Sequence, residues 1–174
     1  MKKDFYNNPL RLLWRGKRSL MPTYLWVIWI VILLFELVMI KYFRHVINFS
    51  AFTFEKFFTP SLTGLTFTLA LFVAEKNVFR RDELKELAKY QGNKKCKGWA
   101  LDELLSPFMF TSILFLLTGT ISLLGQFIYW RICNDKLIDI IFITVYVDIL
   151  LLALFGLFGL IVVTLNDTYL SSKR

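Results

Sequence analysis

Long apolar runs alternate with short charged segments along this chain of 174 residues. Four runs, at residues 22–40, 58–78, 105–130 and 138–165, carry almost no charge. Each is about 20 residues or longer, the length that an α-helix needs to cross the ~30 Å hydrocarbon core of a membrane. A transmembrane β-barrel would instead need strands of about 10 residues with alternating polarity. The pattern predicts an all-α, polytopic membrane protein with four transmembrane helices and a single domain over residues 1–174.

The second apolar run continues into charged sequence without a helix breaker. No proline or glycine occurs between Gly64 and Gly92, so the pattern predicts one continuous helix over Pro60–Gly92. At about 1.5 Å per residue this helix is roughly 48 Å long and extends beyond the hydrocarbon core. A basic turn at 93–98 and a helical return from Trp99 to Leu105 follow. We therefore expect residues 79–104 to form a cytoplasmic helical hairpin.

A basic segment at residues 1–21 precedes the first span. Leu10, Leu13 and Trp14 have the spacing of one helical face, with arginines on another. Two interpretations stay open: an amphipathic helix in the inner headgroup layer, and a solvated flank that only sets orientation. The basic residues of this segment that could meet anionic lipid are Arg11, Arg15, Lys17 and Arg18. No small-x-small cleavage site follows the apolar run, so a cleaved signal peptide fits poorly.

The distribution of charge predicts the orientation. The net charge is +8, but the basic residues flank apolar spans and no nucleic-acid module accompanies them, so nucleic acid is not an expected partner. With the N-terminus inside, 16 Lys and Arg residues lie on the cytoplasmic side and 5 outside, as the positive-inside rule requires. Both termini are then cytoplasmic. Composition and the lack of a targeting peptide fit the cytoplasmic membrane of a bacterium.

Two acids interrupt the apolar spans. Glu36 lies about 21 Å from the inner end of the first span, and Asp148 about 15 Å inside the fourth, so both are expected in the outer half of the membrane. A carboxylate facing lipid is costly, so each acid should face the protein interior or water, or be protonated, and an ion-binding or proton-binding role is one interpretation. In the alternative interpretation Glu36 reaches outward to Lys41 or Arg44, and Asp148 hydrogen-bonds a serine or threonine across a helix interface.

Small and hydroxyl residues form stripes on the spans. The second span carries one stripe at Thr59, Thr63, Thr66, Ala70 and Ala74, and a neighbouring one at Ser61, Gly64, Thr68 and Glu75. The third span has a polar face at Thr111, Thr118, Ser122, Gly125, Gln126 and Tyr129. We favour helix packing as their use, with a water-filled path as the alternative. The candidate ion pathway is Asp148, Glu36, Thr63, Thr66, Thr118, Ser122 and Gln126.

No constellation typical of an enzyme is visible. The chain has no metalloprotease, nucleophile-elbow or phosphate-loop motif, so we expect neither catalysis nor a cofactor. Cys96 and Cys133 are predicted on opposite sides of the membrane, and no cysteine–histidine cluster suggests a metal. Ala153, Gly156 and Gly159 recur every third residue of the fourth span, where they allow another helix to approach closely.

Two functions follow from these features. The first is a small channel or pore, built as a homo-oligomer because four spans enclose little space; a toxic membrane effector is a variant of it. The second is a non-catalytic membrane anchor or regulatory subunit, which docks a cytoplasmic protein through its basic hairpin. The hairpin residues that would contact the partner or anionic lipid are Arg80, Arg81, Lys94, Lys95 and Lys97.

Overall fold

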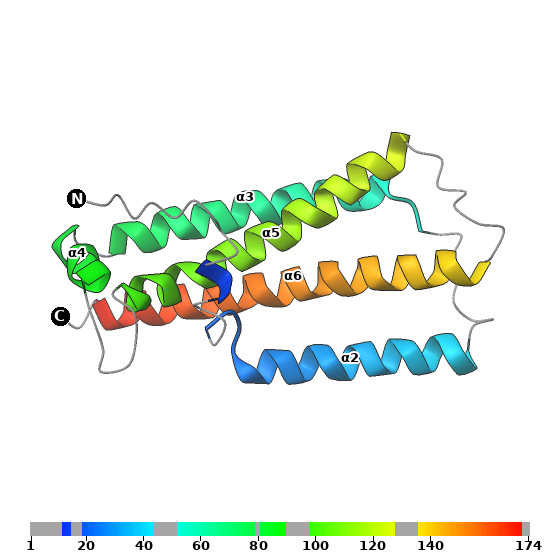
Figure 1. The fold of residues 1–174 in the computed structure, drawn as a ribbon, viewed down its shortest axis with the longest axis horizontal. Coiled ribbons are helices and arrows are strands. Elements are labelled where there is room, and N and C mark those ends of the chain that lie inside the picture. The colour runs from blue at the N-terminus through cyan, green and yellow to red at the C-terminus, as the bar shows by residue number, and fades with distance from the viewer. Residues whose placement is uncertain are drawn as a thin grey trace.

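The computed structural model describes residues 12–14, 19–43, 52–78, 81–89, 98–127 and 136–171. Labelled as in Figure 1, its helices are α2 (Thr23–Tyr42), α3 (Glu55–Val78), α4 (Arg81–Lys89), α5 (Trp99–Phe127) and α6 (Lys136–Ser171). Four of them, all except α4, are long and apolar enough to cross a membrane. The described part of the chain is therefore all-helical, with four candidate spans of a multi-pass membrane protein at the places that the sequence predicted.

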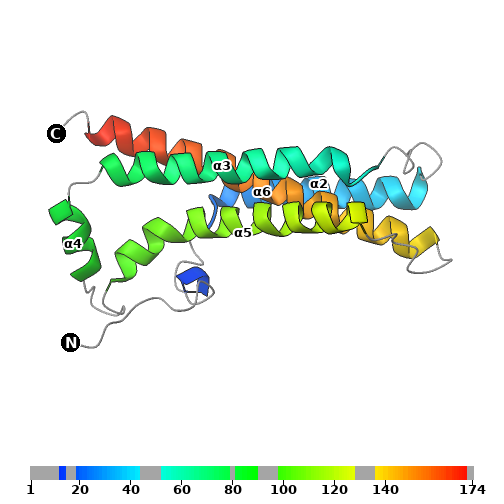
Figure 2. The same ribbon diagram turned by 90° about the horizontal axis from the view of Figure 1, so that it is seen from above.

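Three of the long helices form the core of the bundle. α3, α5 and α6 pack against one another, and α2 lies on the outer side of α6 (Figure 1). The last residues of α3 and α6 and the first of α5 lie at the same end as α4, which we name the α4 end (Figure 2). α2 begins short of this end, at the level of Gly159 in α6, so the three core helices extend beyond it.

Buried residues recur every seven positions on the core helices. Residues spaced this way keep to one side of a helix along its whole length. On α3 they are Ser61, Thr68 and Glu75; on α5 they are Phe108, Phe115 and Ser122; and on α6 they are Tyr146, Ala153 and Leu160. Many are small or carry a hydroxyl, which lets helix backbones approach closely. We call these rows the seams of the three helices.

The seam of α3 is one of the two stripes expected from the sequence. The stripe with Ser61, Gly64 and Thr68 is buried. The neighbouring stripe, with Thr63 and Thr66, is exposed on the outside of the bundle. The stripe on α5 also faces the core at Thr111, Thr118 and Ser122. Packing is thus the use of the buried stripes.

Two glycines of the core helices lie in close contact with aromatic rings. Gly64 of α3 faces the ring of Phe115 so closely that a Cβ atom would overlap it, and Gly125 of α5 faces Phe54 in the same way. Near the end opposite α4, the rings of Phe52, Phe54 and Phe57 each lie within 5.9 Å of the Tyr146 ring. Side chains therefore fill the space between the core helices there.

The predicted continuous helix is replaced by two helices. α3 ends at Val78 and α4 starts at Arg81, with residues 79–80 outside the described residues, and α4 turns across the end of the bundle (Figure 2). A straight projection would have exposed the apolar edge of this segment to water. In the observed position Leu87 is partly buried, and the Ala88 carbonyl approaches Gly98, whose positive φ of 81° suits glycine.

Pro107 lies further inside its helix than the sequence indicated. The predicted span placed it in a first turn, but α5 already begins at Trp99. A proline has no N–H, so the carbonyl four residues earlier loses its helical donor. That carbonyl, of Glu103, accepts hydrogen bonds from the hydroxyls of Ser19 (2.8 Å) and Ser106 (3.3 Å). The proline thus creates an attachment point for the segment before α2.

Gly64→Ala tests the close packing of α3 on α5. The added methyl group displaces the buried Phe115 ring, and overpacking of this kind costs about 1–3 kcal/mol of unfolding free energy. Gly119→Ala is the matched control, because its Cβ would meet Ser61 at an ordinary 3.4 Å. Both substitutions raise the helix propensity by the same amount. In detergent, G64A should unfold at a lower temperature than G119A. Equal melting temperatures would contradict the packing.

Candidate functional site

A pair of acids lies between α2 and α6. The carboxyl groups of Glu36 and Asp148 lie next to one another, and both side chains are partly buried. The sequence predicted both acids in the outer half of the membrane, on separate helices, and did not indicate that they meet. The antiparallel packing of α2 on α6 brings them together. Glu36 lies six residues, or about 9 Å, from the end of α2.

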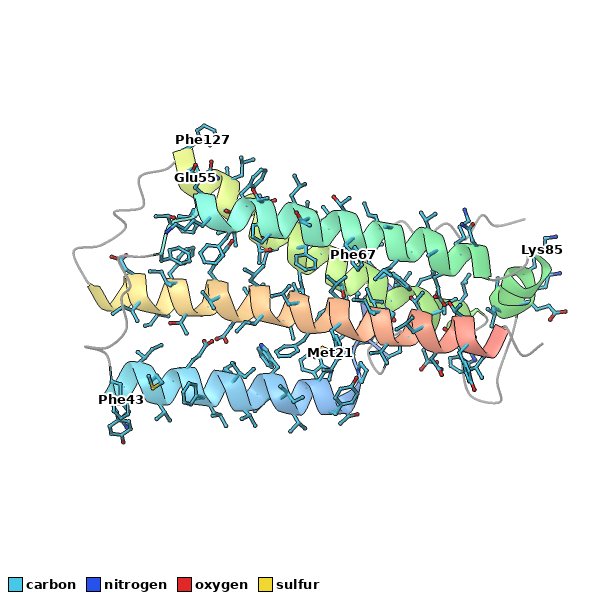
Figure 3. All side chains as sticks on the ribbon, turned by 180° about the vertical axis from the view of Figure 1, so that it is seen from behind. Met21, Phe43, Glu55, Phe67, Lys85 and Phe127 are labelled. Atoms are coloured by element: carbon cyan, nitrogen blue, oxygen red, sulfur yellow. The ribbon has the colours of Figure 1, made fainter. Side chains whose placement is uncertain are left out.

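The backbone around Asp148 is also a contact point for α2. The indole Nε1 of Trp29 donates a hydrogen bond to the Asp148 carbonyl at 3.3 Å. Further along α6, Gly159 lets Pro22 and Leu25 approach its backbone, and Figure 3 shows Met21 between the start of α2 and α6. Lys41 lies over the ring of its neighbour Tyr42 at 5.3 Å. Among the described residues, which do not include Arg44, the partner of Glu36 is Asp148.

Two adjacent carboxyl groups in a medium of low dielectric do not both stay ionised without a positive charge between them. The pair can hold a proton or bind a small cation. Asp148 Oδ1 is buried and has no hydrogen-bond partner in the described part of the chain, so an acceptor position is open. This arrangement is chemically suited to binding and releasing a proton or cation within the membrane.

Two other residues of the candidate pathway, Thr118 and Ser122, are fully buried in the core. The Thr118 hydroxyl donates to the Leu114 carbonyl at 3.0 Å, and the Ser122 hydroxyl donates to the Phe54 carbonyl. Tyr146 donates in turn to the Thr118 carbonyl at 3.2 Å. The Ser122 hydroxyl therefore joins α5 to the segment before α3, and the Tyr146 hydroxyl joins α6 to α5, whereas the Thr118 hydroxyl bonds to carbonyls of its own helix.

The remaining pathway residues lie on the outside of the bundle. Thr63, Thr66 and Gln126 are exposed, and Thr66 donates its hydroxyl proton to the Leu62 carbonyl of its own helix at 2.9 Å. The seven candidates thus occupy three separate places: the α2–α6 interface, the core, and the outer surface of α3 and α5. Only Glu36 and Asp148 are brought together as a pair of ionisable groups.

The basic candidates fall mostly outside the described residues. This holds for Arg11, Arg15, Lys17, Arg18, Arg80, Lys94, Lys95 and Lys97. Arg81 is the first residue of α4. On the described part of that helix Lys85, Glu86 and Lys89 are exposed, and Lys85 points away from the bundle (Figure 3). Ahead of α2, Leu12 is buried and Trp14 is 75% exposed.

A second acidic pair was missed by sequence reasoning. Glu75 of α3 is buried next to Asp167 and Thr164 of α6. The sequence contained a signal for Glu75, which falls on the same stripe as Ser61 and Thr68. Once that stripe is assigned to packing, Glu75 must be buried with it. Asp167 gave no comparable signal, because it follows the predicted end of the fourth span.

A scan of protein-family models, a search of curated proteins and a search of solved structures each find no match to this chain. Within the described ranges, no group of three or more His, Cys, Asp and Glu side chains is arranged to hold a metal ion.

Tyr146→Phe tests the hydrogen bond between α6 and α5. Tyr146 is only 2% exposed. Removing its hydroxyl group takes away the hydrogen-bond donor from α6 to the Thr118 carbonyl. We expect the unfolding free energy to fall by about 1 kcal/mol, measured by denaturation in detergent. Tyr24→Phe, at a half-exposed position of α2, is the control and should have no effect. An equal effect of both substitutions would show that the Tyr146 hydrogen bond does not contribute specifically to stability.

Proposed function

We propose that this protein binds a proton or small cation within the membrane at the Glu36–Asp148 pair and lets it pass between the two sides. The observation that carries the proposal is the contact between two carboxyl groups from different helices inside the spans. Burying even one carboxylate in hydrocarbon costs several kcal/mol unless it is compensated. Replacing buried ionic groups by apolar residues of similar volume is often neutral or stabilising, so stability alone gives little reason for two acids at this position.

The position of α2 supports access to this pair. α2 packs along α6 and is exposed over most of its surface, whereas the seams of the core helices are filled by side chains. An ion would therefore pass beside α2 or between copies of the chain, and not through the three-helix core. We propose a homo-oligomer, in which the exposed hydroxyl stripe of α3 is available to pack against a second copy.

The proposed orientation keeps both termini and α4 in the cytoplasm of a bacterial cell. It rests on the excess of basic residues on that side. The Glu36–Asp148 pair then lies nearer the outer face. Anionic lipids of the inner leaflet are the proposed partners of the basic segments.

Asp148→Asn tests the proposal in liposomes that contain purified protein and a trapped pH-sensitive dye. We expect proton or cation flux from the wild type, and a decrease of about tenfold or more in D148N, equivalent to about 1.4 kcal/mol. Asp139→Asn, at an exposed position in the first turn of the same helix, should retain the flux. Equal flux in all three proteins would exclude the pair from the pathway.

A second function is favoured by α4. This helix lies across the end of the bundle with Lys85, Glu86 and Lys89 exposed, as a docking surface for a cytoplasmic protein would require. If the protein is a non-conducting anchor, no flux is measured under any ion gradient. In that case the wild type retains a cytoplasmic partner, and the double variant Lys85→Gln/Lys89→Gln loses it. Lys41→Gln, at the other end of the bundle, is the control and should retain the partner. A partner retained equally by all three would exclude α4 as the docking surface.

A further inference from the structure

The seams of α3 and α6 both end in an acid. On α3 the series Ser61, Thr68 ends at Glu75, and on α6 the series Ala153, Leu160 reaches Asp167 seven residues later. These two helices run in the same direction (Figure 1), so both acids arrive at the α4 end. Asp167 and Thr164 lie one turn apart on α6, where both are polar neighbours of Glu75.

The oxygens of this cluster lack partners. Glu75 is 2% exposed, and neither of its carboxyl oxygens makes a hydrogen bond with the described residues. The hydroxyl of Thr164, a residue 8% exposed, is also buried without a partner. Buried polar groups are nearly always paired with protein, water or an ion. Three unsatisfied oxygens from two helices that face one another therefore indicate a missing ligand.

The charge of the cluster identifies the class of ligand. Among the described residues, the polar neighbours of Glu75 are Asp167 and Thr164, neither of which is positive. Asp102, buried near the start of α5, adds another acid at this end, whereas Lys76 is exposed. Carboxylate and hydroxyl oxygens are ligands of hard cations. Two carboxylates balance the charge of a divalent ion.

Magnesium suits such a site better than calcium. Ca²⁺ takes six to eight oxygen ligands, largely from protein, whereas Mg²⁺ keeps several waters and is bound through one or two carboxylates. The cluster has two carboxylates and one hydroxyl, with Asp167 only partly buried beside the exposed Asn166 and Thr168. Water could therefore complete the coordination from that side.

We propose that Glu75, Asp167 and Thr164 form a Mg²⁺ site at the α4 end, which ties α3 to α6. The site is separate from the Glu36–Asp148 pair, since Asp167 and Asp148 are 19 residues apart on α6, roughly 28 Å. It needs no passage of ions across the membrane. Bound Mg²⁺ stabilises the folded bundle because the unfolded chain does not assemble the three ligands.

Thermal unfolding of the purified full-length protein in detergent tests the site, with EDTA or Mg²⁺ added. We expect the melting temperature of the wild type to rise with Mg²⁺, by about 5–10 °C at a hundredfold excess over Kd. Glu55→Gln, exposed on α3 at the opposite end (Figure 3), should show the same rise. Glu75→Gln and Asp167→Asn should lose it. K⁺ at matched ionic strength should give no rise.

The EDTA samples show whether the variants fold. Glutamine has nearly the shape of glutamate and no charge, so Glu75→Gln should melt at or above the wild-type temperature in EDTA. If the wild type shows no Mg²⁺-dependent rise, the cluster binds no Mg²⁺ and the proposal is wrong. An equal rise in all variants would place the ion elsewhere and overturn it too. Neither result depends on flux, so the function proposed above is tested separately.

Discussion

The close approach of α3, α5 and α6 is the interaction on which the rest of the structure depends. In a membrane there is little hydrophobic gain from bringing apolar helices together, so association relies on close packing and interhelical hydrogen bonds. The seven-residue seams supply both: Gly64 receives Phe115, and Tyr146 donates to the Thr118 carbonyl. Because this core is filled, the described carboxyl groups of the spans lie at its edges or its ends.

α6 carries acids towards two of its neighbouring helices, α2 and α3, at two depths. Asp148 meets Glu36 of α2, and Asp167 meets Glu75 of α3. The first pair belongs to the loosely packed α2–α6 interface, where a proton or cation could enter and leave. The second belongs to the end of the tight seam, where a bound cation would stabilise the bundle. The same chemistry thus has two proposed uses, which differ because the packing around each pair differs.

The sequence was sufficient to predict the four spans and to identify Glu36 and Asp148 as acids inside them. Apolar length alone determines where helices can cross a membrane, and a charge inside such a run is visible without any structure. It did not show that the two acids meet, because this depends on which helices are neighbours. The end of α3 at Val78 was missed for a related reason: no proline or glycine marks it, and the direction of α4 depends on its contact with α5.

The most direct test of the account is a double-mutant comparison of ion flux in liposomes. Glu36→Gln, Asp148→Asn and the double variant should be measured beside the wild type. If the two carboxyls form one site, each single variant loses most of the flux and the double variant loses little more. If the losses of the single variants multiply in the double variant, the acids act independently and the central claim is contradicted.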